Sequence, residues 1–259
     1  MANLNVFSLE GKTALIAGAS RGIGLAIAQH TARAGARTVL AARSMDALEA
    51  HARALREEGH SAEAHELDIS DRASVDRIAD DYPAVDTLIN VSGTNVRKHF
   101  AAYSPEEYER ILNINLHGIV QLTQRVGVSM VQRGAGGKIV MIGSLTSLIG
   151  LPYVTVYTIT KSALGGLTKA LAAEWGRHNI QVNCIAPGFI IPDLNRKMWE
   201  PEEMKQWLIG GQGTPRTGTP EDIAPLAVFL SGKGSDFING QIIAADGGFS
   251  TTAVWPFEP

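Results

Sequence analysis

Three polar side chains in the middle of the chain have the types and the spacing for proton transfer. Tyr157 and Lys161 are four residues apart, so on a helix they share one face, and Ser144 ends an apolar run upstream of them. A free tyrosine titrates at about pH 10, and a neighbouring ammonium group lowers that pKa by stabilising the phenolate. A tyrosine in this setting can act as a general acid or base. Because a Tyr-x-x-x-Lys pattern also arises by chance in many helices, its meaning depends on the surrounding motifs.

A glycine-rich turn near the N-terminus predicts a phosphate site. The first apolar run leads directly into AGASRGIG (17–24), whose glycines at 18, 22 and 24 open a predicted helix. Glycines let the backbone approach a pyrophosphate, and the helix N-terminus offers free N–H groups and the positive end of its dipole. The spacing is G-x-x-x-G-x-G, which differs from the commoner G-x-G-x-x-G fingerprint of dinucleotide-binding proteins. Such a turn can equally serve tight packing alone, so this motif by itself leaves both interpretations open.

The end of the second apolar run indicates which dinucleotide would bind. An Asp or Glu about 20 residues beyond the glycines would bind the ribose 2′-hydroxyl of NAD. Ala42, Arg43 and Ser44 stand there instead. A guanidinium and a hydroxyl suit a 2′-phosphate, and Arg21 in the glycine turn can add a second cation. A surface arginine after a strand is also common as a solvated charge, but the missing carboxylate favours NADP(H) over NAD(H).

Two more polar residues follow predicted strands. Asp68 comes after the third apolar run, and Asn90 ends the fourth, within NVSG (90–93). Ligands of open α/β sheets bind at the carboxyl ends of the strands, so both residues are candidates for the cofactor site. Asp68 alone could equally be a helix N-cap or a loop acid.

Short apolar runs alternate with longer amphipathic stretches, and this alternation predicts the fold. The helical patterns lie at 23–34, 45–58, 104–131, 157–177 and 220–231. The seven predicted strands are KTALIAG (12–18), TVLAA (38–42), a weak run at 63–67, TLINV (87–91), KIVMIG (138–143), IQVNCIA (180–186) and QIIAA (241–245). Strands that are apolar throughout and alternate with helices form a doubly wound parallel sheet. We therefore expect the α/β class, with a Rossmann-type seven-stranded parallel sheet, helices on both faces, and a single domain over residues 1–259.

One segment interrupts this alternation. Between residues 188 and 218 the chain is rich in glycine and proline, and only one short helix is indicated, around 194–208. A long loop in a compact domain usually serves function, often as a lid over a site. Trp199 and Trp207 lie in this segment, and lining a substrate pocket and plain packing explain them equally well.

Composition and charge disfavour several other classes of protein. Of 259 residues 45% are hydrophobic and 19% charged, which is typical of a globular chain. A formal net charge of −3, without a Lys/Arg cluster, speaks against nucleic acid or a membrane surface as a partner. Apart from His60 and His65, which straddle a predicted helix end and strand, no two histidines have ligand spacing, so no metal site is expected. A single cysteine, the absence of signal-peptide features and the lack of a run of about 18 apolar residues lead us to expect a cytoplasmic protein.

Taken together, these motifs resemble the short-chain dehydrogenase/reductase family. The resemblance extends from LEGKTALIAG to ADGGF (245–249) and includes, in the same order and spacing, AGASRGIG, NVSG, Asn115 in NINLHG, Ser144 in MIGS, YTITK (157–161) and APG (186–188). It implies an oxidoreductase in which Tyr157 is the catalytic acid/base and Ser144 hydrogen-bonds the substrate oxygen. Lys161 would hold the nicotinamide ribose and lower the tyrosine pKa, and Asn115 would position a proton-relay water.

The same resemblance implies which residues bind the cofactor, in addition to Tyr157 and Lys161. These residues lie in the turns that follow the predicted strands: Gly18, Ser20, Arg21, Gly22, Ile23 and Gly24 beside the phosphates, Arg43 and Ser44 at the 2′-phosphate, Asp68 and Ile69 at the adenine, Asn90, Ser92 and Gly93 on the adenosine side, and Pro187, Gly188 and Ile190 beside the nicotinamide. Ala17 stands where the family usually has threonine, and Val91-Ser92 replace the usual Asn-Ala. The first change could loosen the link between the first strand and the turn after the fourth.

Within the family, the stretch at 174–195 resembles gluconate 5-dehydrogenases and related sugar-acid reductases, with Asp193, Leu194 and Asn195 in the lid. The expected reaction is therefore the interconversion of a ketone and a secondary alcohol on a small, polar, sugar-acid-like substrate. Family members are commonly tetramers that pair the helices near 104–131 and 157–177, so a homo-oligomer is also expected.

Two alternatives remain. A 3-oxoacyl-carrier-protein reductase usually presents arginines to its acidic carrier; this chain has Ala135 and His178 at those positions, although Arg133 and Arg177 are close neighbours. A cofactor-binding protein without catalysis is disfavoured because all four predicted catalytic residues are present.

Overall fold

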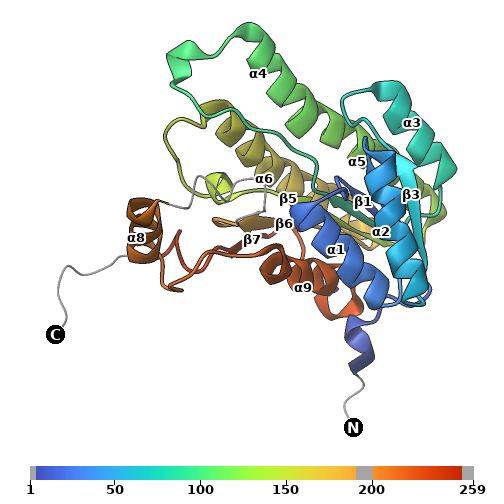
Figure 1. Ribbon diagram of the computed structural model, residues 1–259. Coiled ribbons are helices and arrows are strands. Elements are labelled where there is room, and N and C mark those ends of the chain that lie inside the picture. Colours follow the sequence, from blue (N-terminus) through green and yellow to red (C-terminus); the bar gives the residue numbers. More distant parts are fainter. Residues whose placement is uncertain (1–3, 191–200, 253–259) are drawn as a thin grey trace.

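A computed structural model of the protein describes residues 4–190 and 201–252. In this part of the chain seven parallel strands form one sheet in the order β3-β2-β1-β4-β5-β6-β7 (Figure 1). The strands are β1 (Thr13–Ala17), β2 (Arg37–Ala42), β3 (Ala62–Glu66), β4 (Thr87–Asn90), β5 (Gly137–Ile142), β6 (Ile180–Pro187) and β7 (Ile242–Ala245). Because every neighbouring pair is parallel, the carboxyl ends of all these strands lie at one edge of the sheet. The predicted doubly wound, seven-stranded fold is confirmed.

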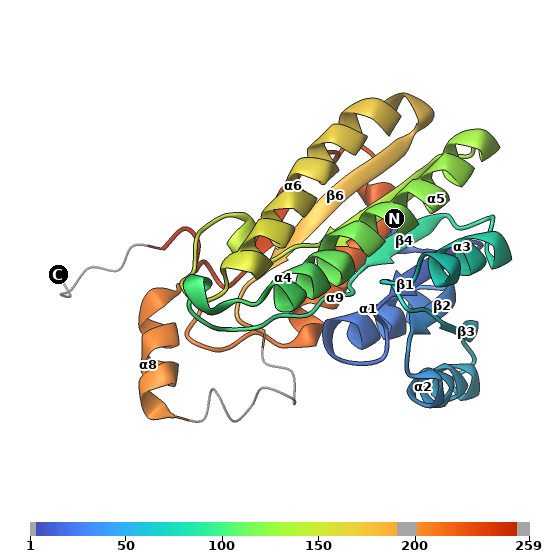
Figure 2. The same cartoon turned by 90° about the horizontal axis from the view of Figure 1, so that it is seen from above.

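Helices cover both faces of the sheet (Figure 2). One face carries α1 (Gly22–Arg33), α2 (Met45–Glu57) and α9 (Pro220–Ser231), and the other carries α3 (Arg72–Asp81), α5 (Gly118–Arg133) and α6 (Thr155–Trp175). Two further helices, α4 (Pro105–Leu112) and α8 (Glu202–Gly211), lie near the carboxyl edge, α8 at its far end. The shorter 3-10 turns are η1 (Leu4–Phe7), η2 (Phe100–Ala102), η4 (Leu145–Ser147), η5 (Gly176–His178) and η7 (Lys233–Ser235). Across 4–190 and 201–252, no helix is both long and apolar enough to cross a membrane.

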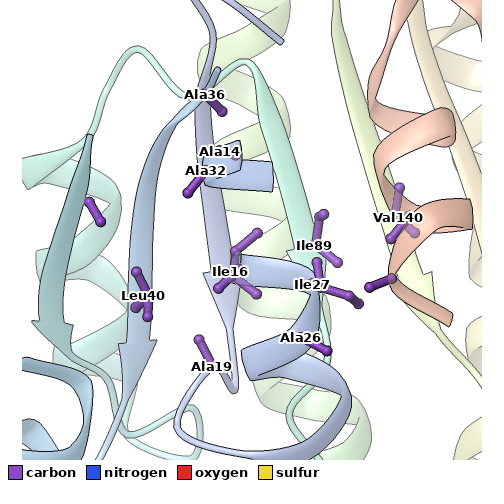
Figure 3. Packing of buried hydrophobic residues seen from close by; sticks show 14 of the residues in the cluster. Ala14, Ile16, Ala19, Ala26, Ile27, Ala32, Ala36, Leu40, Ile89 and Val140 are labelled. Carbon is purple, nitrogen blue, oxygen red and sulfur yellow. The ribbon is translucent and has the colours of Figure 1, made fainter. Parts of the chain in front are cut away.

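Branched aliphatic side chains form a separate core on each face. On the α1 face, Ile16 of β1, Ile89 of β4 and Val140 of β5 lie around Ile27 of α1, and all four are buried (Figure 3). The alternate residues of the same strands, such as Leu15, belong to the core under α5 and α6. Because these strands are buried on both faces, they show no alternation of polar and apolar residues, which is why they read as unbroken apolar runs.

The helix prediction at 104–131 needs correction. The structure divides this stretch into α4, a π-helical turn η3 (Asn113–His117) and α5. A π turn holds one extra residue, and such turns are frequent at functional sites. Helix α3 has no counterpart in the prediction, because its sequence, RASVDRIADD, is largely polar. Asp71 caps the start of this helix, and its carboxylate accepts the N–H groups of Ala73 and Ser74.

The two ends of the predicted lid meet at the sheet edge. Ile190 pairs with Gly218 in an isolated β-bridge, and the Gly218 N–H donates to the carbonyl oxygen of Phe189 at 3.0 Å. Helix α8 extends to Gly211, beyond the predicted end of the short helix. Asp193, Leu194, Asn195 and Trp199, which were assigned to the lid, lie outside the described residues.

Candidate active site

Tyr157 and Ser144 meet at the carboxyl edge of the sheet. Ser144 follows the end of β5, and Tyr157 lies in the first turn of α6. Their side chains are hydrogen-bonded to each other. The Thr146 N–H donates to Ser144 Oγ at 3.1 Å, so the serine hydroxyl hydrogen is left for the phenol oxygen. The strand end and the helix start thus bring these two residues together, as their spacing predicts.

Lys161 lies one turn further along α6 and is buried, with 3% of its surface exposed. Its Nζ donates to the carbonyl oxygen of Ile142 at 2.8 Å and lies 5.6 Å from the centre of the Tyr157 ring. Burial lowers the pKa of Lys161 to about 8, because a charged ammonium loses hydration there; the neighbouring Cys184 acts weakly in the opposite direction. The side chain is therefore a desolvated cation with one backbone acceptor.

The pKa of Tyr157 is raised, which corrects the predicted lowering. Burial is the main cause, because the phenolate would lose its hydration, and the hydrogen bond with Ser144 acts in the opposite direction. The ammonium group of Lys161 is directed to the carbonyl of Ile142 rather than to the phenol oxygen. This arrangement holds the phenol in its protonated form at neutral pH.

Asn115 is buried in the middle of the π turn η3 and ties two parts of the site together. Its amide makes paired hydrogen bonds with Thr94 in the loop after β4: Nδ2 donates to the Thr94 carbonyl at 2.8 Å, and Oδ1 accepts the Thr94 N–H at 2.7 Å. Nδ2 also lies 3.3 Å from Thr160 Oγ1 on the catalytic helix. Because both ends of the amide are engaged, a relay water held by Asn115 would have to bind its main chain.

Thr94 and Thr160 are positioning residues that the sequence motifs do not reveal. The hydroxyl of Thr160 donates to the carbonyl oxygen of Tyr157 at 2.7 Å and so joins Asn115 to the catalytic helix. The only signal in the sequence is that Thr160 directly precedes Lys161. Thr94 gives no signal, because it takes part through its main chain.

Gly18 lies where the chain turns out of β1, at the point where the sheet order reverses between β1 and β4. Its φ is 100°, and a β-carbon there would lie 2.7 Å from the Ser92 nitrogen, so only glycine fits. The carbonyl oxygen of Ala17 accepts the N–H groups of Val91 at 2.8 Å and Ser92 at 2.9 Å. The main chain therefore holds β1 to the turn after β4, although position 17 is alanine and lacks the usual threonine hydroxyl.

The start of α1 has the properties of an anion site. Arg21 occupies the N-cap position without making a side-chain cap, and the first helical hydrogen bond runs from the Leu25 N–H to the Arg21 carbonyl at 3.3 Å. A β-carbon at Gly24 would lie 2.1 Å from the Gly18 oxygen, so glycine allows the helix to start close to the turn. The uncapped N–H groups and the dipole suit a pyrophosphate. The predicted phosphate contacts all lie in this turn or the first turn of α1: Gly18, Ser20, Arg21, Gly22, Ile23 and Gly24.

Arg43 and Ser44 are exposed between β2 and α2. Ser44 precedes α2 but makes no capping hydrogen bond, so its hydroxyl and the helix start are both available to an anion. Asp68 lies close enough to Arg43 to feel its charge. The pKa of Asp68 is lowered chiefly by the Ser70 hydroxyl, which donates to it at 2.6 Å; partial burial opposes this, and Arg43 adds to the lowering. Asp68 thus has a structural role, because its carboxylate accepts hydrogen bonds from the Ser70 N–H and hydroxyl in the turn after β3.

Two predicted adenosine contacts lie deeper than expected. Asn90 is 0% exposed, and its Nδ2 donates to Thr123 Oγ1 at 3.1 Å, because the side chain points to the α5 face of the sheet. A contact of Asn90 with adenosine would therefore have to come from its main chain. Ile69 is also buried against the start of α5, which leaves only its main chain for the adenine. Gly93 is exposed and Ser92 partly so, at the sheet edge as predicted.

The turn after β6 closes the other side of the site. Pro187 ends the strand, and a β-carbon at Gly188 would lie 2.6 Å from Asp246 Cα, so the turn packs tightly on the end of β7. The Ile190 N–H donates to the Gly188 carbonyl at 3.0 Å. A cavity of about 310 Å³ lies between this turn, the loop at 212–218 and the turn at 244–248. None of the four predicted catalytic residues lines it, but Gly188 and Ile190, which are predicted to flank the nicotinamide, do.

Trp207 joins α8 to this turn. Its ring centre lies 5.4 Å from that of Phe189 and 5.6 Å from that of Phe249, and these two phenylalanines are 5.0 Å apart. The indole nevertheless stays 49% exposed. Trp207 therefore packs on its neighbours with one part of the indole and leaves the other part exposed, where it is free to line a pocket.

Known proteins resemble this chain over nearly its full length. The family model described as Enoyl-(Acyl carrier protein) reductase matches residues 18–250. Gluconate 5-dehydrogenase of Gluconobacter oxydans (strain 621H) is 36% identical over 256 residues, which cover 97% of this chain and 100% of that protein. A 3-oxoacyl-[acyl-carrier-protein] reductase of Chlamydia trachomatis is 34% identical over 247 residues, covering 93% and 98%. The crystal structure of a gluconate 5-dehydrogenase from Burkholderia cenocepacia J2315, in complex with NADP and tartrate, matches with a TM-score of 0.92 at 35% identity, covering 96% and 99%.

The fold and the site together define an oxidoreductase of the dinucleotide-binding α/β class. A glycine turn at the β1–β4 crossover, a hydrogen-bonded Ser144–Tyr157 pair and Lys161 one turn on are all present at one sheet edge. The chain belongs to the short-chain dehydrogenase/reductase family. It is therefore an enzyme of a family that acts on CH–OH groups and the corresponding carbonyls.

Proposed function

We propose that the protein is an NADP(H)-dependent oxidoreductase that interconverts a small, polar, sugar-acid-like ketone and its secondary alcohol. The observation that carries this proposal is the hydrogen bond between Ser144 and Tyr157 beside a glycine turn that fits a dinucleotide. The nicotinamide, when bound, supplies or accepts the hydride.

Tyr157 is the residue that moves the proton. Burial keeps its phenol protonated, so in reduction it donates a proton to the carbonyl oxygen, and Ser144 hydrogen-bonds that same oxygen. Lys161, whose pKa is about 8, stays charged at neutral pH, and its ammonium group would hold the nicotinamide ribose. Asn115 holds the loop after β4 against the catalytic helix and positions the relay water through its main chain.

A preference for NADP(H) is supported by the groups at the start of α2. Arg43 and the uncapped Ser44 stand where an acid would read the ribose of NAD, and Arg21 lies in the turn before α1. The Burkholderia relative was solved with NADP bound. The other predicted cofactor contacts, at Asp68, Ser92, Gly93, Pro187, Gly188 and Ile190, surround the same edge of the sheet.

The substrate class is proposed from the relatives. The Gluconobacter and Burkholderia proteins are gluconate 5-dehydrogenases, and the Burkholderia structure also holds tartrate, a hydroxylated dicarboxylate. A small polyhydroxylated keto acid therefore fits this chain best.

Reduction of 3-oxoacyl groups on a carrier protein is the alternative, supported by the Chlamydia relative. It would need exposed cations for an acidic partner. Arg133 donates to the Val85 carbonyl at 2.7 Å and lies 3.7 Å from Asp86, so this cation is already engaged within the chain. Of the two arginines considered for this role, Arg177 in η5 is the one that is exposed, which makes the carrier protein the weaker candidate. A cofactor-binding protein without catalysis is weaker still, because the four catalytic positions are intact.

We further propose a single domain over residues 1–259 and a cytoplasmic homotetramer that pairs α4, α5 and α6 between subunits. Apolar side chains that stay exposed on these helices support the pairing: Val128 on α5 is 44% exposed, and Ile159 on α6 is 43% exposed.

The test is a panel of substrates, with the turnover of each measured as the loss of absorbance of the reduced cofactor. It contains 5-keto-D-gluconate, other keto sugar acids, unsubstituted alkyl ketones and an acetoacetyl thioester of acyl carrier protein, each with NADPH and with NADH. We expect the highest kcat/KM for a keto sugar acid with NADPH. A higher value for the thioester would favour the alternative, and no oxidation with any substrate would contradict the proposed function.

A further inference from the structure

Two aromatic side chains stand exposed beside the catalytic pair. Tyr153 lies in the loop that joins Ser144 to α6, four residues before Tyr157, and 48% of its surface is exposed. Its ring meets the imidazole of His99 edge-on, with ring centres 4.8 Å apart and an interplanar angle of 81°. His99 comes from a different loop, between β4 and α4. The loops after β4 and β5 therefore meet through these two rings.

The backbone of Tyr153 is strained. Its φ is 66°, in the left-handed region that side chains other than glycine rarely adopt. Among the described non-glycine residues only Asn179 shares a positive φ, and it ends η5, a position where asparagine is common. Strain of this kind concentrates at functional sites. Since glycine would make the same turn without strain, the tyrosine side chain itself has a role.

The loop that carries His99 is held firmly against Tyr153. The Lys98 N–H donates to the Tyr153 carbonyl at 2.9 Å, which ties the two backbones together next to the rings. The Lys98 ammonium lies 2.6 Å from the Glu107 carboxylate at the start of α4. At its other end the loop is fixed by the paired hydrogen bonds of Asn115. Both rings therefore occupy set positions before a substrate arrives.

We propose that His99 and Tyr153 form the wall of the substrate site that reads the hydroxyl groups of a polyhydroxylated substrate. This inference rests on the proposed function and deepens it. A phenol and an imidazole can each donate and accept a hydrogen bond, which suits alcohols of either orientation. Tyr153 directly precedes Val154, the N-cap of α6, and Tyr157 lies in the first turn of that helix, so the wall adjoins the position of the substrate carbonyl.

The pair also selects against apolar substrates. An alkyl chain laid against His99 and Tyr153 would cover polar groups without pairing them, and an unpaired buried polar group costs more than a paired one gains. A site that hydrogen-bonds a substrate hydroxyl therefore rejects an analogue that lacks it. Selection of this kind acts on binding and leaves the chemical step at Tyr157 and Ser144 unchanged.

The test uses Tyr153→Phe and His99→Phe, which keep the ring packing and remove the hydrogen-bonding groups. For the best keto sugar acid we expect KM to rise about tenfold in each variant, the loss of roughly one hydrogen bond, while kcat stays within about twofold. KM for a straight-chain alkyl ketone and the Kd for NADPH should not change. Tyr108→Phe, at another exposed tyrosine on α4, is the matched control and should match the wild type.

Two results would overturn the proposal: an unchanged KM for the keto acid in both variants, or equal rises for the keto acid and the alkyl ketone, which would indicate a structural role. Tyr153→Gly provides a check on folding, because it relieves the positive φ. It should be as stable as the wild type and still lose affinity for the keto acid; retained affinity would contradict a role for the side chain. The proposed function is tested by the activity of the wild type alone. If the wild type does not reduce keto sugar acids, the role of His99 and Tyr153 can still be tested. The same variants are then compared on the best hydroxylated ketone and on the corresponding deoxy compound.

Discussion

At the scale of single residues, the buried ammonium group of Lys161 lowers the stability of the fold. The ammonium group is desolvated between α6 and β5 and has the Ile142 carbonyl at 2.8 Å as an acceptor. Its pKa falls from 10.5 in the unfolded chain to about 8 in the fold. Under the proposed mechanism this buried cation serves activity at the expense of stability, a combination that is common at functional sites.

Replacing this cation should stabilise the fold. We expect Lys161→Met to raise the free energy of unfolding by about 2 kcal/mol at pH 7, since the desolvation penalty is only partly offset by the lost hydrogen bond to Ile142. Denaturant unfolding measures the effect, and activity should be lost. Lys169→Met, at an exposed lysine of the same helix, is the control and should be nearly neutral.

The stabilisation should also depend on pH. Between the folded pKa of about 8 and the unfolded pKa of 10.5, the unfolded chain binds more protons, so the wild type gains stability as the pH rises through this window. The advantage of Lys161→Met should be largest below pH 8 and shrink towards pH 10.5. An advantage that does not change with pH would contradict this account of Lys161.

Arg43 is the residue that should decide between the two dinucleotides. We expect Arg43→Ala to weaken NADPH binding by at least about tenfold, the loss of a charged hydrogen bond, and to change NADH binding by less than about twofold. Equilibrium titration of both cofactors measures this. Arg53→Ala, at an exposed arginine of α2, should leave both affinities unchanged. If Arg43→Ala weakened the binding of NADPH and NADH equally, Arg43 would not be the residue that binds the 2′-phosphate.

At the scale of elements, the turn between β1 and α1 leaves room for nothing larger than glycine. We expect Gly18→Ala to lower the free energy of unfolding by about 2–4 kcal/mol, because it combines a φ of 100° with a β-carbon 2.7 Å from the Ser92 nitrogen. Cofactor binding should be lost with it. Gly150→Ala, where the φ is ordinary and no atom lies within 4 Å, is the matched control. Normal stability of Gly18→Ala in thermal unfolding would show that the turn is less crowded than described.

The elements also show which parts of the fold a sequence can reveal. The central strands could be predicted because burial on both faces forces unbroken apolar runs, whereas β3, a partly exposed edge strand with the sequence AEAHE, gives only a weak signal. The π turn at Asn113–His117 could not, since one extra residue in a long helix leaves the apolar pattern nearly unchanged. The burial of Asn90 depends on the register of β4 with its neighbours, Ala17 in β1 and Met141 in β5, which only the folded sheet provides.

The same limit applies to the site. The types and spacing of Ser144, Tyr157 and Lys161 were enough to predict that they share one edge. The direction of the tyrosine pKa was not predictable, because it depends on burial and on where the Lys161 ammonium points. The positive φ of Tyr153 likewise has no signal in the sequence.

At the scale of the whole molecule, the helices that flank the catalytic edge keep apolar side chains in solvent. If α5 pairs between subunits, Val128→Glu should place a charge in that contact and dissociate the oligomer without unfolding the chain. Light scattering with circular dichroism measures both properties. Gln124→Glu adds the same charge at an exposed position of the same helix and is the control. A wild type that is already monomeric would contradict the proposed pairing.

The whole account depends on Tyr157 as the group that moves the proton. The most direct test compares Tyr157→Phe with the wild type, using the best substrate of the panel and NADPH. We predict that kcat/KM falls by about 1,000-fold, as expected for loss of a general acid, while the Kd for NADPH stays within about twofold. A Tyr157→Phe variant with normal cofactor affinity and near-normal turnover would contradict the mechanism.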